Sequence, residues 1–185
     1  IKGGQYMKHE EISVYLSDKA FIGMVISAVE AFKKETLGAV FGFITKHNEI
    51  IVEYVIPYQS VERKYVEVSP NWRRESKILG LLPEITHLDH IGYFHSHTEY
   101  GDKKPVTSLS DADIDSMYEG HVELVIAIWQ SKQPVGLGYY ENTKELSFPI
   151  NEGKYNLKIA AYFKDDSGAI SKCKIVCPYV VGLYE

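Results

Sequence analysis

The sequence predicts a single α/β domain in which helices and apolar strands surround one hydrophobic core. Its 185 residues are 45% hydrophobic, which suffices for one substantial core and matches the usual length of one domain. Segments with helical spacing of apolar residues alternate with short apolar runs along most of the chain, and strand-like runs dominate its last third. We expect the domain to span residues 7–185 and residues 1–6, which precede Met7, to derive from expression.

The first elements expected are a helix and two antiparallel strands. Ser17 and Asp18 are typical of a helix start, and apolar residues then recur at helical spacing up to Glu35. This predicts a helix over 18–35. Two apolar runs separated by a polar turn predict strands over 39–44 and 50–56.

The middle of the chain combines a second helix with a buried strand. Asn71 is a suitable cap for a helix that runs to about Leu82 and buries Ile78, Leu79 and Leu82. A strand is expected over 91–97, followed by a loop over 98–109 and a helix that begins at Ser110. Five further strands are expected over 122–129, 135–140, 146–150, 157–163 and 174–181.

Composition excludes several classes of protein. A formal net charge of −5 argues against a dedicated nucleic-acid binder, which normally carries a basic excess. The chain has no apolar run of about 18 residues and no visible signal peptide, so we expect a cytoplasmic protein without membrane contact. Cys173 and Cys177 form neither a disulfide framework nor a CxxC pair, and are expected to be buried small hydrophobes.

The residues with the clearest chemistry are His95 and His97, two apart at the end of the strand over 91–97. Alternate side chains of a strand share a face, so both imidazoles can ligate one zinc ion. Asp113, in the first turn of the following helix, is the candidate third ligand, which leaves one position for water. Glu35 is the candidate unligated carboxylate that accepts the proton of this water and delivers it to a leaving amine.

Each element also has a simpler interpretation. A histidine pair at a strand end occurs often without a metal, and Ser110 with Asp113 matches the cap of a helix N-terminus. Glu35 is compatible with an exposed last helical turn. His87 and His90, just before the strand, are a competing pair of ligands.

Three segments in order resemble the JAMM (JAB1/MPN/Mov34) metalloprotease family. Residues 35–42 (ETLGAVFG) look like its E-[ST]-x-G-x-x-x-G segment, residues 92–97 (GYFHSH) like its H-x-H strand, and residues 109–113 (LSDAD) like its [PL]-S-x-x-D segment. The similarity covers roughly residues 12–140. Two departures are Thr98, where the family usually has Pro, and the loop over 98–109, which is longer than usual.

The resemblance implies a fold, a cofactor and an activity. The fold is an MPN/JAB domain: a mixed, mostly antiparallel curved sheet flanked by helices, similar to cytidine deaminase. One zinc ion per chain is held by His95, His97 and Asp113, with Glu35 as general base and Ser110 stabilising the oxyanion. Such members are isopeptidases that cut after the C-terminal glycines of ubiquitin or a ubiquitin-like modifier. The alternatives are a zinc peptidase or amidase acting on a sulfur-carrier precursor or small peptide, and a non-catalytic MPN scaffold.

Overall fold

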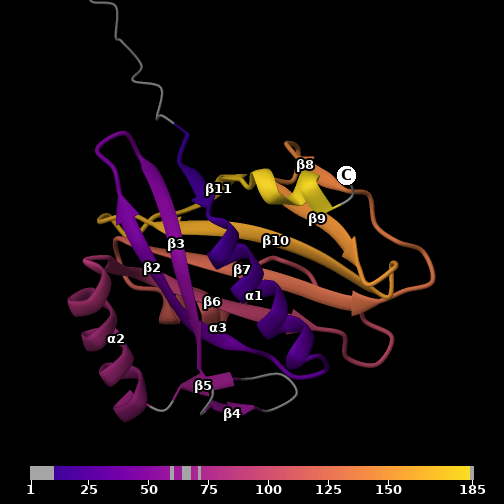
Figure 1. The fold of residues 1–185 in the computed structure, drawn as a ribbon, viewed down its shortest axis with the longest axis horizontal. Coiled ribbons are helices and arrows are strands. Elements are labelled where there is room, and N and C mark those ends of the chain that lie inside the picture. The colour runs from indigo at the N-terminus through magenta and orange to yellow at the C-terminus, as the bar shows by residue number, and fades with distance from the viewer. Residues whose placement is uncertain (1–10, 59–60, 64–67, 71, 184–185) are drawn as a thin grey trace, which may run out of the picture.

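The strands of the protein form one large sheet and one small hairpin (Figure 1). The computed structural model describes residues 11–58, 61–63, 68–70 and 72–183, so the expectation for residues 1–6 lies outside it. In chain order the elements are β1 (Ser13–Leu16), α1 (Asp18–Glu30), β2 (Leu37–Ile44), β3 (Glu49–Pro57), β4 (Val61–Arg63), β5 (Val68–Pro70), α2 (Trp72–Thr86), β6 (Asp89–Thr98), α3 (Asp111–Ser116), β7 (His121–Gln130), β8 (Gly138–Tyr140), β9 (Glu145–Ile150), β10 (Tyr155–Lys164), β11 (Ile170–Val176) and the 3-10 helix η1 (Pro178–Leu183).

The large sheet closes on itself. Seven strands follow one another in the order β11, β1, β3, β2, β6, β7 and β10, and β10 pairs again with β11. One edge of β10 is shared, because residues 155–159 pair with β9 and residues 161–164 pair with β11. In the described part of the chain, neighbours in the large sheet are antiparallel except at β1–β11, β1–β3 and β6–β7. The architecture is a barrel extended on one side by β9 and β8.

The fold class expected from the sequence is therefore wrong. An α/β domain of MPN/JAB type, with a curved sheet flanked by helices, does not describe a mostly-β chain whose seven strands close into a barrel. One closing pair joins β1, near the start of the described residues, to β11, near their end, with Ser13 opposite Lys174. Local hydrophobic spacing reports which face of a strand is buried, and it does not report which distant strand pairs with it.

The first helix ends earlier than expected. Ser17 caps it as expected, because its side chain accepts a hydrogen bond from the Ala20 N–H at 3.1 Å. The helix stops at Glu30, and Lys33 then adopts a positive φ of 72°, the left-handed conformation that commonly follows a helix end. Glu35 consequently lies in the connection between α1 and β2.

The last predicted strand is also displaced. Instead of 174–181, the structure has β11 over Ile170–Val176 followed by η1. Cys173 and Cys177 are free and buried, as expected, and burial raises the pKa of their thiols to about 12 and about 11. Both are therefore protonated and unreactive near neutral pH.

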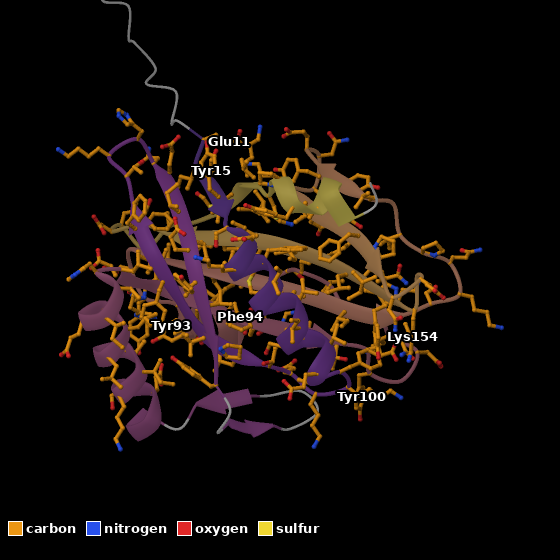
Figure 2. All side chains as sticks on the ribbon, viewed as in Figure 1. Glu11, Tyr15, Tyr93, Phe94, Tyr100 and Lys154 are labelled. Carbon is orange, nitrogen blue, oxygen red and sulfur yellow. The ribbon has the colours of Figure 1, made fainter. Side chains whose placement is uncertain are left out.

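Strand β6 separates two packed layers. Phe94 is fully buried in the main core, whereas its neighbour Tyr93 lies on the side of α2 (Figure 2). On that outer side, Ile78, Leu79 and Leu82 of α2 pack against the layer of Ala39 and Phe41, so the stripe expected to be buried faces this layer and is partly buried. None of the helices in the described residues has the length and hydropathy needed to cross a bilayer.

Candidate metal centre

His95 and His97 project from the outer face of β6. Phe94 and Ser96 are fully buried, so the strand's alternation places the imidazoles of His95 and His97 on the opposite side. Their Nε2 atoms lie 3.1 Å apart. Two tetrahedral zinc ligands with metal–nitrogen bonds of about 2.0–2.1 Å stand roughly 3.3 Å apart, so this spacing fits two ligands of one ion.

Asp113 completes the group from the short helix α3. Its Oδ1 lies 3.5 Å from Nε2 of His95, and its Oδ2 lies 3.6 Å from Nε2 of His97. One ligand atom from each of the three residues lies within 4.8 Å of the others, and together they could hold a metal ion. The histidines are fixed by a strand and the aspartate by a helix, so the group is built on regular structure.

The outer nitrogens of both imidazoles are occupied by acceptors. Nδ1 of His95 lies 2.6 Å from the Glu123 carboxylate, and Nδ1 of His97 lies 2.8 Å from the Val106 carbonyl. Neither partner can donate, so each Nδ1 carries the hydrogen and donates it. A neutral imidazole of this tautomer presents a lone pair at Nε2. When both rings are neutral, two lone pairs and a carboxylate converge on one point, and this donor set fits a cation.

The electrostatics of the group agree with that conclusion. Burial by itself lowers the pKa of His95, but hydrogen bonds with Asp113 and Glu123 outweigh it and raise the pKa to about 10. Burial likewise raises the pKa of Asp113, while its contacts with His95 and His97 shift it below its usual range. The carboxylates therefore stabilise positive charge at Nε2 of His95, and a bound metal ion would take the place of that proton.

Glu35 is brought to the same face by the pairing of β2 with β6. Leu37 lies opposite His95, and the Ser96 N–H donates to the Thr36 carbonyl at 2.9 Å. Continuing this register places Glu35 opposite His97. Residues opposite one another in an antiparallel pair share a face, so this register puts the half-buried Glu35 on the side of the two histidines.

The connection that carries Glu35 is held at both ends. The Thr36 N–H donates to Ser96 Oγ at 2.9 Å, and the Thr36 hydroxyl lies 2.7 Å from that of Ser27. The Lys33 N–H donates to Thr98 Oγ1 at 3.2 Å. Thr98, which stands where the JAMM family usually has proline, therefore supports this connection through its hydroxyl. Proline has no hydroxyl and could not accept this hydrogen bond.

Ser110 both caps α3 and holds Asp113. Its hydroxyl and its backbone N–H each donate to Asp113 Oδ2 at 2.7 Å, and the Asp113 N–H donates back to Ser110 Oγ at 3.2 Å. This reciprocal pattern is a capping box. The capping interpretation and the metal-ligand interpretation of Asp113 are thus compatible.

Sequence reasoning missed Glu123, although the sequence contains a signal for it. It is a charged side chain, 7% exposed, in the otherwise apolar run of β7. Charged residues are almost never buried without a partner. The parallel pairing of β6 with β7 places Tyr93 opposite Glu123 and brings its carboxylate to His95.

We expect replacement of Glu123 by alanine to lower affinity for Zn²⁺ by about 10- to 100-fold, the usual effect of losing a hydrogen-bond partner of a metal-binding histidine. Glu123→Gln keeps the shape and one acceptor and should show the smaller loss. Competition titration with a chromogenic chelator measures both, with the exposed Glu119→Gln as control. Unchanged affinity in Glu123→Ala would contradict the assigned contact.

The competing ligands His87 and His90 do not join the group found in the described residues. His87 is exposed, and the His90 ring packs against Phe41, Tyr93 and His121 with centroids 4.7–5.6 Å apart. Burial lowers the pKa of His90 to about 4, so it is a neutral packed side chain at neutral pH.

The expected loop over 98–109 begins after β6, which ends at Thr98, and it is anchored at several points. Glu99 accepts a hydrogen bond from the Gln130 N–H at 3.1 Å, and Val106 supplies the carbonyl to His97. Asp102, Lys103 and Lys104 are exposed, while Tyr100, 61% exposed, marks the loop in Figure 2. The loop therefore helps to build the candidate metal centre, because its Val106 carbonyl contacts His97.

Comparison with known proteins informs the fold. No family model matches the chain, and no curated protein matches it. The structure is similar to the solution structure of protein DSY2949 from Desulfitobacterium hafniense, with a TM-score of 0.59, 89% of this chain and 92% of that chain covered, and 15% sequence identity. A likeness at this identity concerns the fold alone.

Proposed function

We propose that the protein is a zinc-dependent hydrolase of JAMM type that cleaves the amide bond after the C-terminal glycines of ubiquitin or a ubiquitin-like modifier. The observation that carries the proposal is the convergence of His95, His97 and Asp113. The β2–β6 register, continued two residues beyond its last pair at Leu37, adds Glu35 to the same face. The proposal depends on the site and its motif, since the fold expected from the resemblance is wrong.

The ligand set favours zinc over other common ions. Two imidazole nitrogens and one carboxylate leave an open fourth position, the pattern of catalytic zinc sites. Calcium and magnesium prefer sets made of oxygen atoms. When bound, zinc supplies a Lewis acid that polarises a carbonyl and makes water acidic near neutral pH.

The other roles in the reaction are assigned to groups of this chain. Glu35 accepts a proton from water on the metal-binding face and later delivers it to the leaving amine. Glu123 and the Val106 carbonyl hold the imidazoles in the tautomer that presents Nε2. Ser110 would turn its hydroxyl hydrogen, which it donates to Asp113 Oδ2 in this structure, to the oxyanion formed by attack on the carbonyl.

Ser110→Ala is expected to slow turnover by about 10²-fold, the effect of losing one oxyanion donor. Zinc should stay bound, because the backbone N–H of residue 110 still donates to Asp113 Oδ2 at 2.7 Å. Metal content and kcat of the purified variant separate the two effects, with the exposed Ser108→Ala as control. Loss of zinc would show instead that the hydroxyl acts by holding Asp113.

The decisive experiment measures bound metal and cleavage in the same preparation. We expect one zinc ion per chain and cleavage of isopeptide-linked or linear ubiquitin-like substrates that stops with 1,10-phenanthroline and returns with added zinc. Cleavage restricted to short peptides or sulfur-carrier precursors would favour the alternative substrate class. Zinc without any cleavage would favour a scaffold, and absence of stoichiometric metal would overturn the proposal.

A further inference from the structure

A partly buried polar network anchors the loop that contacts His97. Thr107 is 2% exposed; its hydroxyl donates to Glu145 Oε1 at 2.5 Å, and its carbonyl accepts from the Tyr162 hydroxyl at 3.0 Å. The adjoining residue, Val106, supplies the carbonyl that accepts from Nδ1 of His97. The side chain of Val106 is 62% exposed, so the neighbouring Thr107 anchors this peptide.

Glu145 is itself held by two cations from the barrel wall. Lys158 Nζ lies 2.9 Å from its Oε2, and Lys172 Nζ lies 3.4 Å from its Oε1. Burial raises the pKa of Glu145, but the Thr107 hydroxyl and Lys158 outweigh burial and lower it. The carboxylate is therefore charged and oriented, and its Oε1 is a strong acceptor for the Thr107 hydroxyl.

We propose that Thr107 and Glu145 are positioning residues of the metal centre. The path runs from Lys158 and Lys172 through Glu145 and Thr107 to the Val106 carbonyl, and from there to His97. It fixes the imidazole orientation that presents Nε2 to the metal. This inference rests on the proposed function only in requiring that the wild-type centre binds zinc.

The test compares isosteric variants. Thr107→Val removes the hydroxyl while keeping the volume, and it should lower zinc affinity about tenfold and change the visible absorption spectrum of the cobalt-substituted protein, because His97 is less firmly oriented. Thr107→Ser restores the hydroxyl and should return both to wild-type values. Glu145→Gln, which keeps the shape but loses the charge, should resemble Thr107→Val and serves as the second variant if that protein does not fold.

The controls are Thr143→Val and Glu141→Gln, exposed residues of the turn before β9. Lower thermal stability of the metal-free variants with unchanged zinc affinity would mean that the network only stabilises the barrel, and would overturn the inference. A wild-type protein without zinc would overturn the proposed function instead. Zinc in the wild type with unchanged affinity and cobalt spectrum in Thr107→Val and Glu145→Gln would overturn this inference alone.

Discussion

Asp113→Ala is expected to abolish stoichiometric zinc binding and, with it, all hydrolysis. Asp113 is the only carboxylate of the ligand group found in the described residues, and each of its oxygens faces the Nε2 atom of one histidine. The loss should exceed the roughly 10- to 100-fold effect of a missing outer partner, because a direct ligand disappears. Metal analysis after gel filtration and isothermal titration with Zn²⁺ measure this result.

The alanine variant also removes part of a helix cap, so a second variant is needed. Asp113 accepts two hydrogen bonds from Ser110, and a lost cap costs about 1 kcal/mol of stability. Asp113→Asn keeps an oxygen for the Ser110 N–H but loses the charge, and should bind zinc much more weakly while folding normally. Asp115→Asn, exposed on the same helix, is the matched control. Wild-type zinc affinity in Asp113→Asn would exclude Asp113 as an anionic ligand.

Glu35→Gln is expected to lower kcat by about 10³-fold while leaving one zinc ion per chain bound. Glu35 shares the face of His95 and His97 but is outside the group that could hold the metal. Glutamine keeps the size of the side chain and cannot accept a proton near neutral pH, so the chemical step is affected and the metal is not. Steady-state kinetics and metal analysis on the same preparation measure the two quantities.

The control for this prediction is Glu30→Gln, the exposed last residue of α1. It changes the same charge only a few residues away and should keep full activity. Full activity in Glu35→Gln would remove Glu35 from the mechanism, whereas loss of zinc would make it a ligand. Either result would leave the histidine pair and Asp113 to be judged on the zinc measurements alone.

At His95 and His97, the hydrogen-bond acceptors at Nδ1 determine which nitrogen of the imidazole can bind a metal ion. Either nitrogen of a neutral imidazole can carry the hydrogen. In this protein the Glu123 carboxylate at His95 and the Val106 carbonyl at His97 favour the tautomer with the hydrogen on Nδ1. One of these partners comes from the apolar strand β7 and the other from the long loop. The long loop after β6 thus contributes a backbone carbonyl to the orientation of His97.

Local patterns were sufficient for many elements and for the three side chains that could hold a metal ion. The spacing of His95 and His97 requires a shared face in any strand, and Ser110 with Asp113 forms a cap whatever the rest of the fold is. The start of α1 at Ser17 also follows from local hydrogen bonding. The early end of α1 was missed because Lys33 adopts the left-handed conformation that often follows a helix, and the sequence has no glycine there to indicate it.

The sequence by itself determined features that depend on near neighbours in the chain. These are the strand faces, the helix caps and the residue types of the candidate metal site. Only the tertiary structure decided that the sheet closes, that Glu123 meets His95, and that Thr36, next to Glu35, is bonded to Ser96, next to His97. These results depend on pairings such as β1–β11, β6–β7 and β2–β6. The physical reason is that burial and hydrogen bonding between distant segments select each pairing. The hydrophobic period within one segment carries no information about its distant partner.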